Sequence, residues 1–324
     1  MGENACMPMT DKSRAYLQIH FCVLLWGFTA ILGKLITLPA LPLVWWRMLL
    51  VVAASLLIPR VWRGLRAMSW RLRGAYAGIG VLVALHWLTF YGAIKLSNAS
   101  VGATCMALGT VFVAMVEPWL ARTRFSMRDL ALGLAVLPGV ALVVGGVPAG
   151  MRAGIAVGAL SALLVAIFGS LNKRLVEHGD PLAVTALELG AGMLALAVLA
   201  PAMPWLPGMA HAFAGDLLVL PSARDAILLL FLALACTLLP FALSLVALRH
   251  MSAFAQQLAV NLEPVYAIVL AILLLGEQRE LTPWFYAGVL VILAAVFIHP
   301  LLGRPRVLSQ PEVLGTAETK ACAD

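Results

Sequence analysis

Ten apolar stretches follow one another along the chain, and short polar segments separate them. Each stretch is about 20 residues long, which is the length that an α-helix needs to cross the hydrocarbon core of a bilayer. The pattern therefore predicts an all-α polytopic membrane protein with ten transmembrane helices. The expected spans are residues 15–36, 41–59, 72–94, 98–121, 128–147, 152–172, 181–200, 223–247, 251–275 and 282–301.

Two parts of the chain resemble each other and predict an internal repeat. Residues 93–114 align without a gap with residues 247–268 at a shift of 154, and Lys34 falls on Lys173 at a shift of 139. Each unit holds five helices, and because five is odd, the second unit enters the membrane from the opposite side. Two inverted five-helix repeats are the architecture of many secondary transporters. The predicted parts are a cytoplasmic tail at 1–14, repeat 1 at 15–147, repeat 2 at 152–301 and a cytoplasmic tail at 302–324.

Composition and charge agree with a membrane protein and give its orientation. Apolar residues make up 63% of the sequence and charged residues 11%, against about 25% charged residues in a soluble domain. The net charge of +7 does not indicate a nucleic-acid partner, because the basic residues lie between the apolar stretches. Sixteen Lys and Arg residues fall on the side of the N-terminus, five on the other side, and Arg47 inside a span. The positive-inside rule predicts cytoplasmic termini. The expected location is the plasma (inner) membrane.

The stretch 249–277 can span a bilayer but carries polar residues near its middle. An ionised carboxylate such as Glu263 is costly at the centre of a membrane, so we expect it to face a cavity or the protein interior. Pro264 lacks an N–H and is expected to kink the helix. Gln256 and Tyr266 lie seven residues before and three after Glu263, on the same helical face. These four residues are candidates for solute binding or coupling, and the alternative is a structural hydrogen-bond plug at a kink.

The first repeat carries a counterpart of this kink. At the shift of 154, Gly109 and Thr110 fall on Glu263 and Pro264, so both copies have a helix weakener at corresponding positions. Paired interruptions of this kind are the best sequence pointer to a transport site. Gly109 and Thr110 are therefore further candidates for the site.

His86 and Trp87 lie in the middle of the span 72–94 and complete the candidate site. His86 is predicted either to hydrogen-bond a neighbouring helix or to titrate within the cavity. Aromatic walls with few fixed charges favour an amphipathic organic solute over a bare ion. The aromatic residues expected around the cavity are Trp26, Trp87, Phe90, Tyr91, Phe168, Phe241 and Tyr266.

Other charged residues in or near the spans are expected to be structural. Arg47 follows two tryptophans and is predicted to be an interfacial anchor, and a direct pair with Glu188 is not expected, because the two differ by about 10 Å in depth. Glu117 is expected to reach water or Arg122. Glu277 is expected to shape the loop between the last two helices.

Three segments together resemble the EamA-type family of the drug/metabolite transporter superfamily. They are LLWGFTAILGKL near the start, ALRHMSAFAQQLAVNLEPVYA in the ninth span and LLLGEQRELTPWFYAGVLVILAAV at the end. The resemblance covers residues 15–301 and implies ten helices in two inverted halves, cytoplasmic termini and a central cavity that the solute crosses. It implies a solute such as an amino acid, another small metabolite or a drug, often moved outward. The first half departs from the family pattern, since it lacks the Gly-Glu pair found at Gly276 and Glu277.

The function predicted from the sequence is a secondary transporter that exports a small organic metabolite, such as an amino acid or an aromatic solute, by alternating access. Proton coupling and facilitated diffusion both remain open. The alternatives are a membrane-embedded enzyme and a non-transporting membrane scaffold. The sequence contains no GxSxG, HExxH or GxxxxGK[ST] pattern and no metal-ligand spacing among its five cysteines. No catalytic residue, metal or cofactor is therefore expected.

Two GxxxG pairs concern the packing of helices. Gly74 and Gly78 form one pair, and Gly154 and Gly158 form the other. Such pairs let helices approach closely, and they are expected to pack inside the chain, with a homodimer as the alternative. The expected partners are the small-molecule solute and the lipid bilayer.

Overall fold

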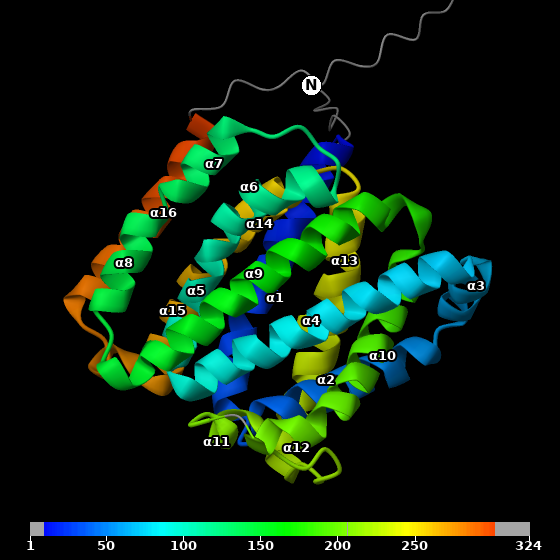
Figure 1. Cartoon of the computed structure of the whole chain (residues 1–324), viewed down its shortest axis with the longest axis horizontal. Helices are drawn as coiled ribbons and strands as arrows, with labels where there is room; N and C mark the ends of the chain where they lie inside the picture. The colour runs from blue at the N-terminus through cyan, green and yellow to red at the C-terminus, as the bar shows by residue number, and fades with distance from the viewer. Residues whose placement is uncertain (1–9, 206, 302–324) are drawn as a thin grey trace, which may run out of the picture.

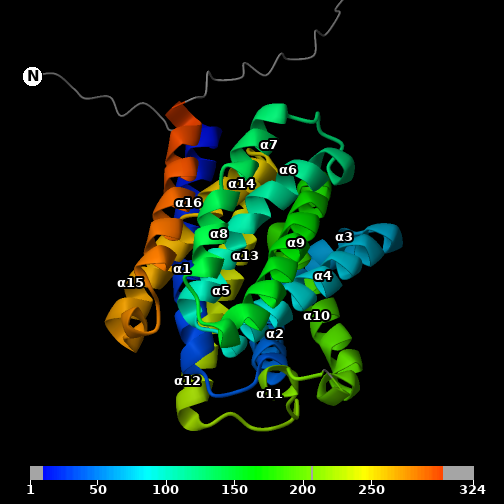
Figure 2. The same cartoon turned by 60° about the vertical axis from the view of Figure 1, so that its left-hand side comes forward.

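The computed structural model describes residues 10–205 and 207–301, with side chains as far as Ala295. Within these residues the chain folds into helices, and no strand occurs. The helices form one bundle, in which α1 (Asp11–Leu35) begins at the same end as α16 (Pro283–Leu301) finishes (Figures 1 and 2). The predicted tail 302–324 and residues 1–9 of the predicted N-terminal tail lie outside the described residues.

The helices of the first half follow the predicted spans within a few residues. They are α1, α2 (Ala40–Leu56), α3 (Pro59–Ala67), α4 (Trp70–Leu96), α5 (Ala99–Cys105), α6 (Gly109–Leu120), α7 (Met127–Leu134) and α8 (Leu137–Gly145). Helix α3 was not predicted, and it turns by 93° from α2. Pro59 starts it at a position where the missing N–H costs no hydrogen bond.

The second half repeats this succession. Its main elements are α9 (Arg152–Leu175), α10 (Pro181–Leu199), α11 (Ala210–Phe213), α12 (Ala223–Ala233), the π-helical turn η5 (Leu234–Leu238), α13 (Leu239–Leu248), α14 (Ala253–Val260), α15 (Glu263–Leu275) and α16. Side chains of Asp180, Ser222 and Ser252 accept hydrogen bonds from backbone N–H groups in the first turns of α10, α12 and α14. These caps explain why the three helices begin where they do.

Eight helical segments of the described chain are long and apolar enough to cross a membrane. Helix α2 passes the same test together with α3, across their bend. Helix α16 is apolar over the part with described side chains, Pro283–Ala295. The prediction of an all-α membrane protein from the apolar pattern is therefore confirmed.

The predicted weak points interrupt the helices at corresponding places. A 3₁₀ turn, η1 (Met106–Leu108), separates α5 from α6, and a turn at residues 261–262 separates α14 from α15. At the shift of 154, η1 falls on residues 260–262. The same shift pairs Arg122 with Gly276, and both adopt the left-handed backbone conformation, with φ of 57° and 70°. The paired interruption is therefore confirmed.

The two halves run through the bundle in opposite senses. Helix α1 leads away from the end of the bundle where α16 finishes, whereas α9, which begins the second half, leads toward it (Figures 1 and 2). Among the close contacts across the bundle are those of α4 with α9 and α10, and those of α1 with α13 and α15. The core therefore mixes helices from both halves.

Glycines allow some of these helices to approach closely. A Cβ at Gly154 or Gly158 would lie 2.8 or 2.7 Å from atoms of the α4–α5 segment, so this pair packs inside the chain as predicted. For Gly74 and Gly78 the prediction of close packing inside the chain is wrong, because a Cβ at either position would have no neighbouring atom within 4 Å. The closest approach is at Gly80 of α4, where a Cβ would lie 2.0 Å from the carbonyl oxygen of Glu188 in α10.

Candidate functional site

A cavity lies inside the bundle, between helices of both halves. Its walls come from α1, α2, α4, α9, α13 and α14, from the first residue of α15 and from the broken segment α5–η1–α6. The enclosed space is about 110 Å³. Pockets that hold drug-sized ligands measure about 300–1,000 Å³, so the solute would have to be small or the cavity would have to widen.

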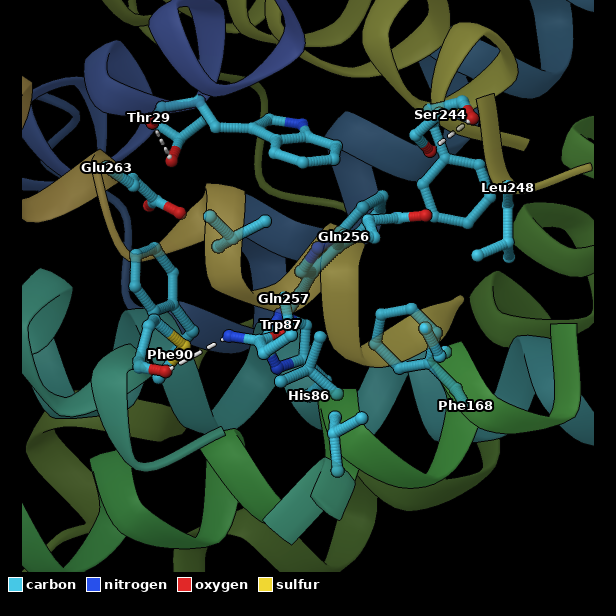
Figure 3. Close-up of a pocket in the computed structure, with 18 of the residues that line it drawn as sticks. Thr29, His86, Trp87, Phe90, Phe168, Ser244, Leu248, Gln256, Gln257 and Glu263 are labelled. Atoms are coloured by element: carbon cyan, nitrogen blue, oxygen red, sulfur yellow. Dashed lines mark hydrogen bonds between the residues drawn. The ribbon is translucent and has the colours of Figure 1, made fainter. Parts of the chain in front are cut away.

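Aromatic side chains form a large part of the apolar wall. Five of the seven aromatic residues that were expected around the cavity do line it, namely Trp26, Trp87, Phe90, Phe168 and Phe241. Tyr91 and Tyr266 are not among the lining residues. Figure 3 shows Phe90 and Phe168 on either side of His86.

Glu263 lines this cavity from the first position of α15, directly after the break in the ninth span. Its side chain is 6% exposed, and no described residue forms a hydrogen bond or an ion pair with its carboxylate. Figure 3 draws no hydrogen bond to this carboxylate. A buried carboxylate without a partner can accept hydrogen bonds from a bound solute.

Arg47 is the second charged residue of the cavity wall, and its predicted role as an interfacial anchor is wrong. It is 2% exposed. Its Nε donates to Thr237 Oγ1 at 2.6 Å, and Nη1 donates to the Tyr91 hydroxyl at 2.9 Å. The guanidinium lies 3.7 Å above the ring of Trp87. Nη2 takes part in no hydrogen bond with a described residue, so it remains able to bind a solute.

Arg47 and Glu263 thus bring opposite charges to one cavity without forming an ion pair. Arg47 also forms no ion pair with Glu188, as expected. The Glu188 carboxylate instead accepts a hydrogen bond from Asn172 Nδ2 at 3.3 Å, outside the cavity wall.

His86 forms the hydrogen bond to a neighbouring helix that was one of the two roles predicted for it. Its Nδ1 lies 2.9 Å from the carbonyl oxygen of Ser161 on the neighbouring helix α9, and it also lines the cavity. Because a carbonyl only accepts, Nδ1 carries the proton in this bond. Its ring centre lies 5.4 Å from that of Phe168 and 6.2 Å from that of Phe90. His86 is therefore fixed in orientation by α9.

The two glutamines that precede the break differ in their environment. Gln256 lines the cavity as predicted, and its buried Oε1 has no hydrogen-bond partner in the described part of the chain. Gln257 also lines the cavity, but its Nε2 donates to the carbonyl oxygen of Met106 at 3.2 Å. Gln256 is therefore the glutamine that is free to bind a solute.

The remaining candidates support the site from outside. A Cβ at Gly109 would lie 2.7 Å from Gln257 Nε2, and Thr110 Oγ1 accepts from Asn261 Nδ2 at 2.7 Å. Pro264 is the second residue of α15 and is buried. Gly109, Thr110 and Pro264 are not among the residues that line the cavity.

The prediction that Tyr266 shares the cavity face with Gln256 and Glu263 is wrong. Tyr266 packs against α1, where a Cβ at Gly27 would lie 2.6 Å from the Cβ of Tyr266. Tyr266 follows Glu263 by three residues within α15, so the two side chains differ by about 60° around the helix axis, and Tyr266 is on the side that faces α1.

Two buried glutamates outside the cavity connect the broken helices of the two halves by hydrogen bonds. The Glu117 carboxylate accepts from the N–H groups of Ala253 and Phe254, at 2.9 and 2.8 Å, at the start of α14. The Glu277 carboxylate accepts from the N–H groups of Ala99 and Ser100, both at 3.0 Å, at the start of α5. Each glutamate therefore caps the broken helix of the other half.

These caps correct the two sequence-based expectations for these residues. Glu117 reaches neither water nor an ion pair with Arg122, since it is 5% exposed and forms no ion pair. Glu277 does more than shape a loop. The first half lacks the Gly-Glu pair, yet Glu117 supplies the same cap from a position six residues nearer the break. The alignment at 154 could not reveal this, because it places Thr123 opposite Glu277.

Arg47 is the residue that sequence reasoning missed at the site. The signal was present, because an arginine within a transmembrane stretch is by default a functional candidate. The preceding tryptophans favoured an interfacial position instead, and the sequence does not show toward which side a helix turns its arginine.

Comparisons with known proteins agree with this architecture. The profile of the EamA-like transporter family matches residues 13–145 and, a second time, residues 152–299. A solved structure, titled only as the crystal structure of a protein, superposes with a TM-score of 0.63 at 17% identity, covering 90% of this chain and 97% of that one. At this identity the likeness shows the fold alone. None of the curated proteins matches this chain.

Proposed function

Because the chain belongs to the EamA-like transporter family and is a multi-pass membrane transporter of the drug/metabolite transporter superfamily, we propose that it exports a small organic solute through the cavity that Arg47 and Glu263 share. The proposed mechanism is secondary transport by alternating access. The proposed location is the plasma (inner) membrane, with both termini in the cytoplasm, as the distribution of Lys and Arg favours.

The proposed architecture is ten transmembrane helices in two inverted repeats. The eight qualifying segments, the bent pair α2–α3 and the apolar α16 add up to ten. The opposite senses of α1 and α9 and the matched helix breaks support the inversion. Inverted repeats with broken helices around a central site are typical of secondary transporters.

The observation that carries the proposed substrate class is a pair of opposite charges in an aromatic cavity, neither of which forms an ion pair with a described residue. Arg47 Nη2 can bind a carboxylate, and Glu263 can bind an ammonium group. Hydrogen bonds to charged groups are each worth about 1.5–3 kcal/mol, and a buried charge without any partner is costly. A solute that carries both charges, such as an amino acid, satisfies both residues at once. Aromatic walls favour an apolar or aromatic side chain on that solute.

Glu263 is also the proposed carrier of a coupling proton. The charged form of a carboxylate is disfavoured at the centre of a membrane, so a proton or an ammonium group is expected to occupy the site in turn. Release of the solute outside would then accompany binding of a proton, and the proton would leave on the cytoplasmic side. A carboxylate that only binds the solute is the rival mechanism.

Neither alternative function finds support in a specific observation. Among the described residues there is no group of three or more His, Cys, Asp or Glu side chains that could hold a metal ion. The members of the matched family are transporters. The Ser161 hydroxyl lies 2.9 Å from His86 Nδ1, but it donates to the His86 carbonyl oxygen, and Ser161 is not among the residues that line the cavity. A transporter therefore accounts for the site better than an enzyme or a scaffold does.

The substrate class can be tested with purified protein and three related compounds: phenylalanine, phenethylamine, which lacks the carboxylate, and phenylpropionate, which lacks the ammonium group. Thermal stabilisation is expected to be largest for phenylalanine. Arg47→Gln is expected to remove the preference for phenylalanine over phenethylamine. Glu263→Gln is expected to remove the preference for phenylalanine over phenylpropionate. Losing one charged hydrogen bond of about 2 kcal/mol corresponds to about 30-fold in affinity.

Glu177 offers a matched control, because it is an exposed glutamate outside the cavity. Glu177→Gln is expected to leave all three preferences unchanged. Equal stabilisation by the three compounds, or by none of a wider panel of amino acids, would contradict the zwitterion site. A comparison of metabolites between cells lacking and cells overproducing the protein would then identify the solute without this assumption.

Transport assays separate the two roles of Glu263. If it carries the coupling proton, Glu263→Gln in proteoliposomes loses accumulation driven by a pH gradient but keeps solute exchange, which needs no net proton movement. If it only binds the solute, the variant loses affinity in both assays. Unchanged behaviour in both assays would make Glu263 a structural group.

A further inference from the structure

A second hollow of the protein is a groove between α10 and the η5–α13 segment, separate from the central cavity. It measures about 380 Å³, and apolar side chains form most of its walls. Leu234 and Leu239 line it and are 38% and 49% exposed, so it opens on the outer surface of the bundle. Its lining runs along this segment from Leu234 to Val246, a length of about 18 Å at 1.5 Å per residue. An elongated apolar groove on a membrane-facing surface fits a hydrocarbon chain.

One end of the groove is charged. Arg60 and Asp180 line it there, and their side chains form an ion pair with a distance of 2.7 Å between Nη2 and Oδ2. Asp180 also accepts from the N–H groups of Leu182 and Ala183, which fixes it at the start of α10. Within this pair the charges cancel, so any preference of this end for an anion must come from other residues.

Helix α3 supplies these other charges. It begins at Pro59 beside the charged end of the groove and lies at the outer edge of the bundle (Figures 1 and 2). Arg60, Arg63 and Arg66 recur at every third position, share one face and are exposed. The opposite face packs on the bundle through buried Val61 and through Gly64, where a Cβ would lie 2.6 Å from the Cβ of Ala183.

Exposed tryptophans mark this region as the membrane–water interface. Trp62 is 45% exposed in α3, and Trp70 is 82% exposed at the start of α4. Tryptophan is enriched where the headgroups meet the hydrocarbon core. A short basic amphipathic helix flanked by tryptophans is suited to lie in the plane of this interface. The arginines of α3 are therefore at the level of lipid headgroups, and the groove extends from there into the hydrocarbon.

We propose that the groove and α3 form a binding site for an anionic phospholipid of the surrounding bilayer. One acyl chain occupies the groove between α10 and α13, and the phosphate and headgroup lie against Arg63 and Arg66. With Arg60 neutralised by Asp180, these two arginines provide the excess positive charge. Arginines near a membrane surface attract anionic lipid with about 1 kcal/mol each, which corresponds to about five-fold in binding per residue.

The test uses the full chain reconstituted in bilayers of equal parts phosphatidylglycerol and phosphatidylcholine. The protein is extracted gently, and the lipids that remain bound are counted by native mass spectrometry. The expected result is retained phosphatidylglycerol in excess over phosphatidylcholine. Replacing both arginines, Arg63→Gln with Arg66→Gln, is expected to reduce that excess by up to about 25-fold. An unchanged lipid ratio in this variant would overturn the proposal.

Matched controls separate this site from general attraction of lipid to a basic protein. Arg14→Gln with Arg124→Gln also removes two exposed arginines, but away from α3, and is expected to leave the ratio unchanged. An equal decrease in this control would overturn the site on α3.

The groove is tested separately by filling it. Ala242→Phe places a large side chain in the groove, whereas Leu230→Phe changes an exposed position of α12 outside it. Only Ala242→Phe is expected to reduce the total lipid retained. If the variant lacking Arg63 and Arg66 does not fold, the result for Ala242→Phe tests the proposal on its own. If the Ala242→Phe variant retains as much lipid as the parent, the proposal is overturned. The proposal is also overturned if a second copy of the chain, and not lipid, is found bound at this face.

Discussion

The reciprocal caps of Glu117 and Glu277 predict a large and symmetric effect on stability. Replacing Glu117 by alanine leaves the N–H groups of Ala253 and Phe254 buried without an acceptor. A buried polar group that loses its partner costs about 1–3 kcal/mol, so the loss of two partners corresponds to about 2–6 kcal/mol. Removal of a negative charge from a helix N-terminus adds about 0.3–1 kcal/mol. We expect Glu117→Ala to destabilise the protein by several kcal/mol.

Glu277→Ala is expected to cost at least as much. Its carboxylate accepts from two backbone N–H groups and also from the Ser100 hydroxyl, at 2.7 Å. A control is provided by Glu280, whose carboxylate receives a single bond at 3.2 Å, from the Asn98 side chain. Glu280→Ala is expected to cost 1 kcal/mol or less, as is usual for such a bond (about 0.5–1.5 kcal/mol).

Thermal unfolding in detergent, followed by the loss of monodisperse protein, measures these differences. For chains of 150–250 residues 1 kcal/mol shifts the midpoint by about 2–4 °C, so we expect shifts of about 5–10 °C for the two caps in this longer chain. A midpoint for Glu117→Ala equal to that of Glu280→Ala would refute the reasoning. The internal repeat also suggests a rescue: Thr123 occupies the position equivalent to Glu277, so Thr123→Glu should partly restore the stability that Glu117→Ala loses.

Three further predictions concern packing, the helix break and topology. Gly80→Ala is expected to prevent stable folding, because its Cβ would lie 2.0 Å from a backbone oxygen. Gly78→Ala, whose Cβ would have no atom within 4 Å, should be neutral or stabilise the protein by up to about 1 kcal/mol. Expression levels and unfolding midpoints compare the two variants. Pro264→Ala is expected to leave the protein inserted and folded while transport slows, and an unchanged transport rate would make the break incidental to function. Single cysteines in the segment 60–73, which holds most of α3 and the start of α4, should resist impermeant thiol reagents added to intact cells, whereas those in the segment 201–222 should react. Reversed labelling would contradict the proposed orientation.

The positions of the helices were predictable because the bilayer imposes a length. An apolar stretch must be about 20 residues long to span the hydrocarbon core, and this constraint does not depend on how the helices pack. The breaks were predictable for a similar reason, since Pro264 lacks an N–H and Gly109 weakens a helix wherever they occur. Helix α3 was missed because it is short and basic, so its pattern resembles that of a loop.

The contacts within the site were less predictable because they depend on rotation and on partners distant in sequence. Arg47 bonds to Thr237, 190 positions away, and the sequence does not specify that α2 turns this face inward. Tyr266 was placed on the cavity face from its spacing to Glu263 within α15, but a spacing does not show which neighbouring helix a side chain meets, and Tyr266 meets α1. The cap formed by Glu117 was missed because an alignment matches positions, whereas the cap requires only that a carboxylate reach the start of α14.

The caps and the breaks together indicate where the protein can change shape. Glu117 and Glu277 hold the two broken segments to each other at opposite ends, and Thr110 and Gln257 add bonds between them near the middle. Helices that are held at both ends cannot separate without leaving buried N–H groups unpaired, which costs several kcal/mol. Bending is cheapest where the ladder of backbone hydrogen bonds is already interrupted, and in these segments that is at η1 and at residues 261–262. Glu263 directly follows the second of these breaks, so a bend there would move the carboxylate relative to Arg47 and alter the site that both line. We therefore expect alternation to proceed with the caps intact, and we expect Pro264→Ala to slow transport without lowering the unfolding midpoint as Glu117→Ala does.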